Sequence, residues 1–181
     1  MYYSTNYASP IGPLTLACDG DGQNLVGLWR QGQKYYGRGI PEAMLARDDI
    51  ALLDDVKAWL DRYFANQRPE IAELSLAPIG GAFRQGVWEI LCGIPYGEVV
   101  TYGQIAKQMA ARANRESMSS QAVGGAVGHN PISIIIPCHR VVGANGSLTG
   151  YAGGIDTKIR LLELEGVDMT TLFVPERSTA P

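Results

Sequence analysis

A segment rich in proline and glycine divides the chain into two differently patterned parts. It runs from Arg68-Pro69 to Pro78-Ile79-Gly80-Gly81 and interrupts the hydrophobic spacing on either side. Exposed linkers of this composition commonly separate domains. The sequence therefore predicts a first domain at residues 1–79, a second at residues 80–166, and a C-terminal tail at residues 167–181.

Strand signals precede helix signals in the first part. Three short apolar runs, at residues 2–7, 14–18 and 25–29, are separated by turn residues. From Asp48 the spacing becomes helical, with an apolar stripe that ends at Phe64. We expect a small antiparallel sheet packed against one helix.

Helical spacing dominates the second part. We expect helices at 82–92, after Thr101, at 120–127 and at 157–165, the last one ended by Gly166. Thr101 and Gln104 have the spacing of a capping box, and the two middle helices resemble a helix-turn-helix with a long turn.

Two further elements are expected near the end of the second part. Residues 132–136 are predicted to form a short buried strand, and residues 143–146 a hairpin turn. The predicted fold class is thus α+β. A small sheet-plus-helix domain is followed by a mostly helical domain that contains a helix-turn-helix and a short strand.

Composition limits the class of protein. With 181 residues, 46% of them hydrophobic, the chain is long enough to bury a core. Three cysteines are few and odd in number, which favours a reducing compartment over a disulfide framework. The N-terminus lacks the features of a signal peptide, and no run approaches the roughly 20 apolar residues of a membrane span. We expect a cytoplasmic protein with no membrane partner.

The net charge of −3 is unevenly distributed along the chain. Residues 1–79 contain seven Lys or Arg against ten Asp or Glu, whereas residues 80–166 contain seven against six. A nucleic-acid contact would therefore come from the second part. The first part offers Cys18 alone as a cysteine ligand, and the glycines near it lack a strand-then-helix context, so we expect neither a metal nor a cofactor.

Cys138 is the residue best suited to nucleophilic chemistry. It follows an apolar run and Pro137, and His139 and Arg140 come directly after it. Because proline cannot donate to a sheet, we expect the strand to stop there and present the thiol at an edge. Basic neighbours favour the reactive thiolate. From these residues alone, a packed structural cysteine remains an equally good interpretation.

Acidity of the thiol cannot account for much catalysis. Lowering a thiol pKa to about 6 raises the thiolate fraction but lowers its intrinsic nucleophilicity, and the net gain is roughly twofold. Positioning and stabilisation of the leaving group must supply the remainder.

Several motifs in residues 80–166 resemble the O6-alkylguanine-DNA alkyltransferase family. The order of the motifs and the block around Cys138 carry the resemblance. They are Gly97-Glu98-Val99-Val100-Thr101-Tyr102-Gly103-Gln104-Ile105-Ala106, Ala122-Val123-Gly124-Gly125-Ala126, Asn130-Pro131, Ile135-Ile136-Pro137-Cys138-His139-Arg140-Val141-Val142, Gly150-Tyr151, Gly153-Gly154, Lys158, Leu161-Leu162 and Glu165-Gly166.

The resemblance implies stoichiometric transfer of a methyl or other alkyl group from O6-alkylguanine in DNA to Cys138, with O4-alkylthymine as a second candidate substrate. His139 would act through a water as the base, and Glu165 would orient His139. Tyr102 would donate a proton to the departing guanine, and Asn130 would brace the site. The family further implies a ribonuclease H-like layout for residues 1–79 and a pocket lined by Val141, Tyr151 and Lys158.

The family also implies a DNA contact through the second helix of the helix-turn-helix, with the target base flipped out of the duplex. The residues implied in this contact are Gln121, Ala122, Gly124, Gly125, Arg140, Arg112 and Arg115. One departs from the pattern, because Gln121 stands where most members have an arginine. We expect Gln121 to fill the gap left by the flipped base, and Arg112 or Arg115 to contact phosphate.

Three other functions are compatible with parts of the sequence. They are a non-enzymatic relative that binds alkylated DNA, a cysteine hydrolase, and a helix-turn-helix regulator. Cys138 argues against the first, because such relatives replace the cysteine. The hydrolase lacks a signature for an oxyanion site, and the helix at 120–127 has few side chains able to read bases. The expected partner is alkylated double-stranded DNA, and we expect a monomer with no obligate protein partner.

Overall fold

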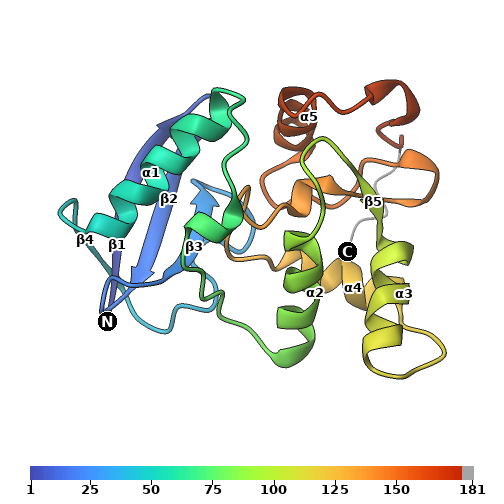
Figure 1. The fold of residues 1–181 in the computed structure, drawn as a ribbon, viewed down its shortest axis with the longest axis horizontal. Coiled ribbons are helices and arrows are strands. Elements are labelled where there is room, and N and C mark those ends of the chain that lie inside the picture. The colour runs from blue at the N-terminus through green and yellow to red at the C-terminus, as the bar shows by residue number, and fades with distance from the viewer. Residues whose placement is uncertain (177–181) are drawn as a thin grey trace. The chain divides into compact units, whose positions relative to one another are not determined.

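The computed structural model describes residues 1–176 of the chain and shows two compact units. The first unit comprises Met1–Gly80 and Pro131–Ile135, and the second comprises Gly81–Asn130 and the chain from Ile136 onward. Strands and helices alternate irregularly along the chain, so the predicted α+β class is confirmed (Figure 1). Residues 177–181 of the predicted tail lie outside the described residues.

A four-stranded sheet forms the centre of the first unit. Strands β1 (Tyr2–Ser9), β2 (Gly12–Asp19) and β3 (Leu25–Arg30) form an antiparallel meander. The short β4 (Met44–Ala46) pairs in parallel with β1, which gives the order β3-β2-β1-β4. The three predicted strands are confirmed. The sequence does not predict β4, because three residues are too few to show alternation.

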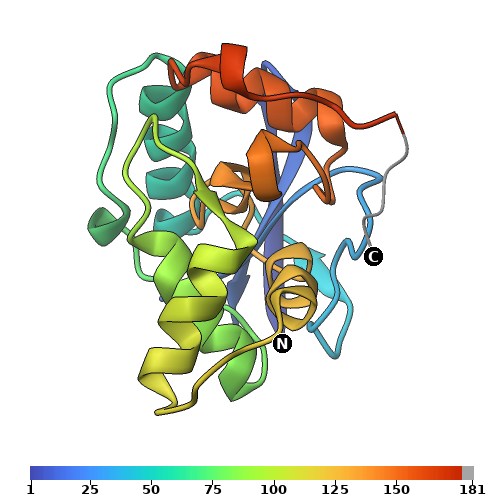
Figure 2. The same cartoon turned by 90° about the vertical axis from the view of Figure 1, so that its right-hand side faces the viewer.

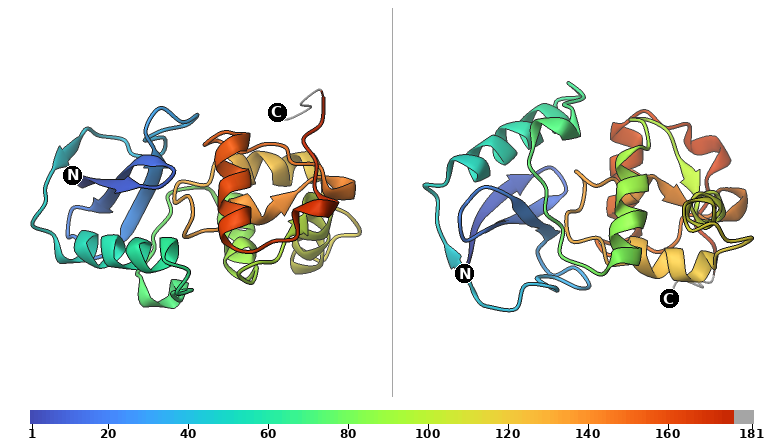
Figure 3. Two further views of the ribbon diagram at one scale, coloured as in Figure 1. Left: turned by 90° about the horizontal axis from the view of Figure 1, so that it is seen from above. Right: turned by 60° about the horizontal axis from the view of Figure 1, so that its bottom comes forward.

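Helix α1 (Ala51–Phe64) packs against β1 and β2 and covers one face of the sheet in both views of Figure 3. The predicted helix is confirmed and begins at Ala51, three residues after the spacing changes. The short helix η1 (Ile71–Glu73) follows it. The residues of α1 that are buried recur at helical spacing, and they are Leu53, Val56, Trp59, Leu60 and Tyr63.

The prediction of a strand at residues 132–136 is wrong. Ile132 makes one isolated parallel bridge with Leu28, and the chain then turns. Ile134 has a φ of 70°, a left-handed conformation that is strained for a β-branched residue and that ends the extended run. All of residues 132–136 are buried. Burial of the apolar run, rather than strand pairing, explains its composition.

Three helices form one cluster in the second unit. They are α2 (Ala82–Cys92), α3 (Tyr102–Arg112) and α4 (Ser120–Gly128), and each packs against the other two. Figure 2 shows the same cluster from the side. Each begins within a residue of its predicted start. The indole of Trp88 on α2 donates to the Ala126 carbonyl on α4 at 2.9 Å, which joins two of the helices.

The N-terminus of α3 has the predicted capping box. The Thr101 hydroxyl accepts from the backbone N–H of Gln104 at 3.1 Å, and the Gln104 side chain accepts from the Thr101 N–H at 2.7 Å. These two bonds satisfy donors that a helix start leaves without partners. The first residue of α3, Tyr102, is therefore held at a fixed point of the backbone.

A short parallel ribbon lies between the helix cluster and the last helix. It pairs β5 (Val100–Thr101) with β6 (Val141–Val142), and α5 (Ile155–Leu164) lies on its other side (Figure 1). The short helix η4 (Met169–Thr171) follows α5. Gly166 has a φ of 74° just beyond α5, as expected for a helix-ending glycine. Among residues 1–176, no helix has the length and apolar character needed to cross a membrane.

The predicted hairpin at residues 143–146 is a turn without a second strand. Helix η3 (Ala144–Gly146) fills it, and the N–H of Gly143 donates to the Ser147 carbonyl at 2.7 Å. Asn145 and Gly146 both have positive φ values. Hairpin turns also use this conformation, which Asn and Gly favour, and this explains why the sequence predicts a hairpin here. The chain after the turn instead bridges residue 173 through Ser147.

Candidate active site

Cys138 is a free, buried cysteine at the start of the short helix η2 (Cys138–Arg140). Its side chain is 6% exposed, and its backbone N–H donates to the Ile136 carbonyl at 2.8 Å. Pro137 precedes the helix with a ψ of 63°, which turns the chain sharply. The thiol is thus held by a turn, not presented at the edge of a strand as predicted.

The expected activation of Cys138 by its basic neighbours is also wrong. Burial raises the pKa of the thiol, while a hydrogen bond from Asn130 and the charge of Lys158 oppose that rise. The thiol is therefore protonated at neutral pH and needs a base when it reacts.

Glu165 holds both basic neighbours of Cys138. Its Oε1 accepts from His139 Nε2 at 2.6 Å, and Arg140 donates to both carboxylate oxygens at 2.8 and 3.0 Å. All three side chains are buried. Arg140 also donates to the Ile94 carbonyl at 2.6 Å and lies over the Tyr96 ring. The guanidinium of Arg140 is thus the buried partner of Glu165, and its contact with DNA stays a prediction.

Protonation of the network defines the tautomer of His139. Hydrogen bonds from His139 and Arg140 hold the pKa of Glu165 far below its usual range despite burial, so the carboxylate is ionised and can only accept. His139 Nε2 must therefore carry a proton. Burial lowers the pKa of His139, so the ring is neutral and Nδ1 keeps a free lone pair. Among residues 1–176, His139 Nδ1 is the one buried side-chain nitrogen or oxygen without a hydrogen-bond partner.

Stability should fall in mild acid because of His139. Its folded pKa lies below its unfolded value of about 6.5, so the unfolded chain binds the proton first. The free energy of unfolding should then decrease below pH 6.5 by up to about 1.4 kcal/mol per pH unit. Glu165, with a lowered pKa, should add to the loss only below about pH 4.3.

Urea unfolding at pH 7.0, 6.0 and 5.0 measures this slope. His139→Gln should flatten it, because glutamine does not titrate. The matched control is His129→Gln, which removes the other histidine of the chain. An unchanged slope in His139→Gln, or a flattened slope in the control alone, would contradict the assignment.

Asn130 and Tyr102 both lie near Cys138. Asn130 follows α4, donates to the Ile136 carbonyl at 2.8 Å and hydrogen-bonds the Cys138 thiol. It thereby braces the turn that carries the cysteine. Burial raises the pKa of Tyr102 to about 12, with a smaller contribution from the charge of Cys138. The Tyr102 hydroxyl thus stays protonated, and it donates to the Thr149 carbonyl at 3.1 Å.

The three residues expected to line a pocket differ in their surroundings. Val141 is buried in β6, and Tyr151 is half-buried beside Gly153, where an added Cβ would lie 2.8 Å from the Tyr151 ring. Lys158 is fully buried, and its ammonium donates to the Val141 and Thr149 carbonyls at 2.5 and 3.1 Å. Burial lowers its pKa to about 8. The Thr149 carbonyl is the site group that sequence reasoning missed, because a backbone oxygen has no residue signature.

Helix α4 presents a narrow surface of small residues. Gln121 and Ala122 are exposed in its first turn, and Ser119 caps it by accepting from the Ala122 N–H at 3.2 Å. A Cβ at Gly124 would make only ordinary contact with the Tyr102 ring, and one at Gly125 would meet open space. Packing inside the protein therefore does not require these glycines, although each destabilises a helix by about 1 kcal/mol relative to alanine.

Two exposed arginines precede α4 in the chain. Arg112, at the end of α3, pairs with Glu89 at 3.2 Å, and both side chains are exposed. An exposed pair of this kind contributes little to stability, so the pairing leaves Arg112 able to contact an anion. Arg115 is exposed in the turn before α4.

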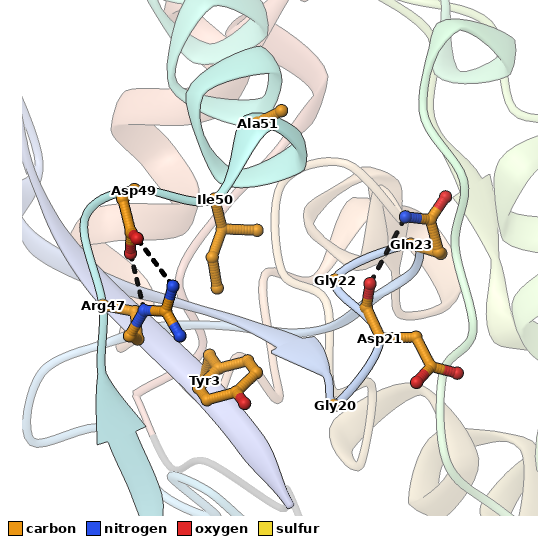
Figure 4. Close-up of a pocket in the computed structure, with 9 residues that line it drawn as sticks. All are labelled: Tyr3, Gly20, Asp21, Gly22, Gln23, Arg47, Asp49, Ile50 and Ala51. Carbon is orange, nitrogen blue, oxygen red and sulfur yellow. Dashed lines mark hydrogen bonds and ion pairs between the residues drawn. The ribbon is translucent and has the colours of Figure 1, made fainter.

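The first unit contains an open hollow of about 330 Å³ (Figure 4). Two of its charged side chains pair, since Arg47 donates to both carboxylate oxygens of Asp49 at 2.6 Å and lies over the Tyr3 ring. None of the predicted site residues lines it. Among residues 1–176, no cluster of histidine, cysteine and acidic side chains is able to hold a metal ion.

Comparison with known proteins identifies relatives over nearly the whole chain. The family models for the ribonuclease-like domain and the DNA binding domain of 6-O-methylguanine DNA methyltransferase match residues 1–78 and 82–167. A methylated-DNA–protein-cysteine methyltransferase of Methanosarcina acetivorans is 42% identical over 92% of this chain and 99% of its own length. A protein of the same name from Mycobacterium bovis is 47% identical, over 91% and 93%.

Solved structures agree with these matches. The O6-methylguanine methyltransferase of Mycobacterium tuberculosis superposes with a TM-score of 0.77 at 43% identity, covering 91% of this chain and 93% of that one. Mycobacterium tuberculosis OGT in complex with DNA superposes with a TM-score of 0.72 at 42% identity, covering 91% of each chain.

Proposed function

Since the chain belongs to the 6-O-methylguanine DNA methyltransferase family, we propose that it repairs DNA by moving a methyl or other alkyl group from O6-alkylguanine onto its own Cys138. O4-alkylthymine is a second candidate substrate. The observation that supports this most directly is a protonated, buried thiol followed by a neutral histidine whose Nδ1 lone pair has no partner. Such a pair supplies a nucleophile and its base.

The proposed step is a displacement at the alkyl carbon. Cys138 Sγ forms a bond to that carbon while the bond between the carbon and guanine O6 breaks. The thiol proton passes through a water to His139 Nδ1, and Tyr102 donates a proton to the departing guanine. The proton on His139 then returns to Tyr102 through solvent, so that both side chains regain their starting protonation states. The product thioether is stable, so each molecule reacts once, and no cofactor takes part.

Glu165 supports this step through the geometry of its network. By accepting from His139 Nε2 it directs the free lone pair to Nδ1, and Arg140 prevents the carboxylate from drawing a second proton onto the ring. Asn130 fixes the turn and lowers the pKa of the thiol. These residues therefore hold the reacting groups in the states that the transfer needs.

Intact-mass measurement tests the function. Incubation with an oligonucleotide duplex that contains O6-methylguanine should add one methyl group to the protein, at the peptide that contains Cys138, and no more with longer incubation. An unchanged mass would refute the proposal and favour a lesion-binding relative. Release of modified product with continued turnover would indicate a hydrolase.

The proposed partner is alkylated double-stranded DNA, bound through α4. The M. tuberculosis relative whose structure includes DNA supports this choice. Ala122, Gly124 and Gly125 would approach the backbone, and the solvent-facing position of Gly125 supports that role. Arg112 or Arg115 would contact phosphate. The proposal further places the protein in the cytoplasm as a monomer without an obligate protein partner.

Gln121 and Gly125 should matter for duplex DNA alone. Gln121→Ala should slow repair of a duplex by about tenfold, because the gap left by a flipped base is no longer filled and unstacking is unfavourable by a few kcal/mol. Gly125→Ala should stabilise the protein by about 1 kcal/mol and also slow duplex repair. Both variants should react with free O6-benzylguanine at the wild-type rate.

The experiment compares transfer rates on the two substrates, with thermal unfolding measured alongside. The control variant is Lys107→Met, an exposed change on α3. Equal losses on duplex and free base would reject the assignment of α4 to DNA contact.

A further inference from the structure

One backbone carbonyl connects two side chains of the site. The Thr149 oxygen accepts from the Tyr102 hydroxyl at 3.1 Å and from the Lys158 ammonium, also at 3.1 Å. Lys158 additionally donates to the Val141 carbonyl at 2.5 Å. Val141 lies in the ribbon directly after the helix that contains Cys138. Lys158 thus ties the cysteine segment to the loop that holds the Tyr102 hydroxyl.

The Tyr102 hydroxyl has a single proton and is already donating it. To protonate or hydrogen-bond the departing guanine, Tyr102 must release the Thr149 carbonyl. The Thr149 carbonyl is part-buried, and a carbonyl sheltered from water that loses its only donor is unfavourable. Here the carbonyl keeps the second donor, because the Lys158 ammonium has three N–H groups. The release of Tyr102 therefore leaves no unsatisfied acceptor behind.

The charge of Lys158 acts in the same direction. A fully buried ammonium lowers the pKa of Cys138 by attraction to the thiolate, so it stabilises the charge that develops on sulfur. Burial brings its own pKa to about 8, and the group is still mostly protonated at neutral pH. The two carbonyl oxygens accept hydrogen bonds from the ammonium, which offsets part of the cost of its burial.

We propose that Lys158 is a positioning residue of the transfer step, whose ammonium holds the Val141 and Thr149 carbonyls so that the Tyr102 hydroxyl passes freely from Thr149 to the guanine. The inference rests on the proposed function. It differs from a pocket-lining role, because Lys158 acts here through Tyr102 and through two backbone oxygens. Its effect should therefore depend on the presence of the Tyr102 hydroxyl.

A double-mutant cycle tests this dependence. Single-turnover reaction with excess free O6-benzylguanine gives a rate at saturation and a half-saturation concentration, and intact mass confirms the modified residue. Lys158→Met should lower the saturating rate by about tenfold or more, a partial loss of the roughly 10²- to 10⁴-fold that acid assistance supplies, and change half-saturation by less than about threefold. Lys107→Met, an exposed lysine on α3, should match the wild type.

The second arm repeats the change in a Tyr102→Phe background. Phenylalanine makes no bond to Thr149, so the carbonyl has the same surroundings before and during the reaction. Lys158→Met should then lower the saturating rate by less than about threefold, the part that is due to its charge near Cys138, which is a clear departure from additivity. The same fold loss in both backgrounds, or a wild-type rate in Lys158→Met, would overturn the inference.

Two measurements separate this inference from its premises. If the wild-type protein gains no alkyl group at Cys138, the proposed function itself fails. If Lys158→Met does not fold, as judged by circular dichroism, Lys158→Gln replaces it, because glutamine still donates to a carbonyl but lacks the charge. That variant should keep the dependence on Tyr102 with a smaller loss, and an equal loss in both backgrounds would again overturn the inference.

Discussion

Replacing Cys138 by serine is expected to abolish alkyl transfer while leaving duplex binding intact. A serine hydroxyl at this buried position is not ionised at any pH at which the protein folds, and its oxygen is a poor nucleophile without a thiolate's polarisable charge. Removing an enzymic nucleophile typically lowers the rate by a factor on the order of 10⁴ or more. Because Cys138 is 6% exposed, the change should not alter the surface that contacts DNA.

The measurement pairs intact mass with an electrophoretic binding assay on the same O6-methylguanine duplex. Cys92→Ser is the matched control, since Cys92 is a half-buried free thiol at the end of α2. Burial raises its pKa, so it should take no methyl group. Methylation that persists in Cys138→Ser, or that disappears in Cys92→Ser, would show that the acceptor is a different residue.

Local rules were sufficient for most elements of the fold. The capping box at Thr101 and Gln104 predicts the start of α3 because both bonds lie within four residues. Likewise, α1 buries one face, so its helical spacing identifies it. Strands β2 and β3 are buried along almost their whole length, so they are identified as short apolar runs bounded by turn residues. A protein whose elements are defined by short-range contacts is largely predictable at this level.

The segment before Cys138 shows where such rules fail. Its isoleucines are as buried as those of a central strand, and composition alone cannot separate a paired strand from a buried turn. Ile134 adopts a positive φ that its side chain disfavours. A local bond from the Ile135 N–H to the Ser133 carbonyl closes the turn, and contacts distant in sequence, such as that between Ile132 and β3, hold it in place.

Arg140 shows the corresponding limit for the site. From sequence, an arginine beside a DNA-reactive cysteine is most simply assigned to phosphate. Its actual partner, Glu165, lies 25 positions further along the chain, and Ile94 and Tyr96 precede α3. The residues around Cys138, His139 and Glu165 could be named in advance through family resemblance, but the sharing of one carboxylate by a neutral imidazole and a guanidinium follows only from the three-dimensional arrangement.

Arg140→Met is therefore expected to slow alkyl transfer at neutral pH and to make it recover in alkali. Arg140 lowers the pKa of His139 by charge repulsion, and it shares the carboxylate that would otherwise stabilise an imidazolium. Burial, the largest cause of the lowered His139 pKa, remains in the variant, but without the Arg140 charge that pKa should rise, and a larger share of the ring should be protonated at pH 7. Each unit by which the pKa exceeds the pH removes the neutral base about tenfold. We expect a rate about 10- to 100-fold below wild type at pH 7.

The ratio of the variant rate to the wild-type rate should rise as the pH increases from 7 to 9, because His139 is restored to its neutral form in the variant alone. Titration of Lys158, with a pKa of about 8, affects both proteins and cancels in the ratio. Free O6-benzylguanine is the substrate, so a phosphate-binding role for Arg140 would predict no loss at all. Arg160→Met, an exposed arginine on α5, is the control for net charge. A ratio that stays constant with pH would mean that Arg140 supports the fold without affecting the pKa of His139.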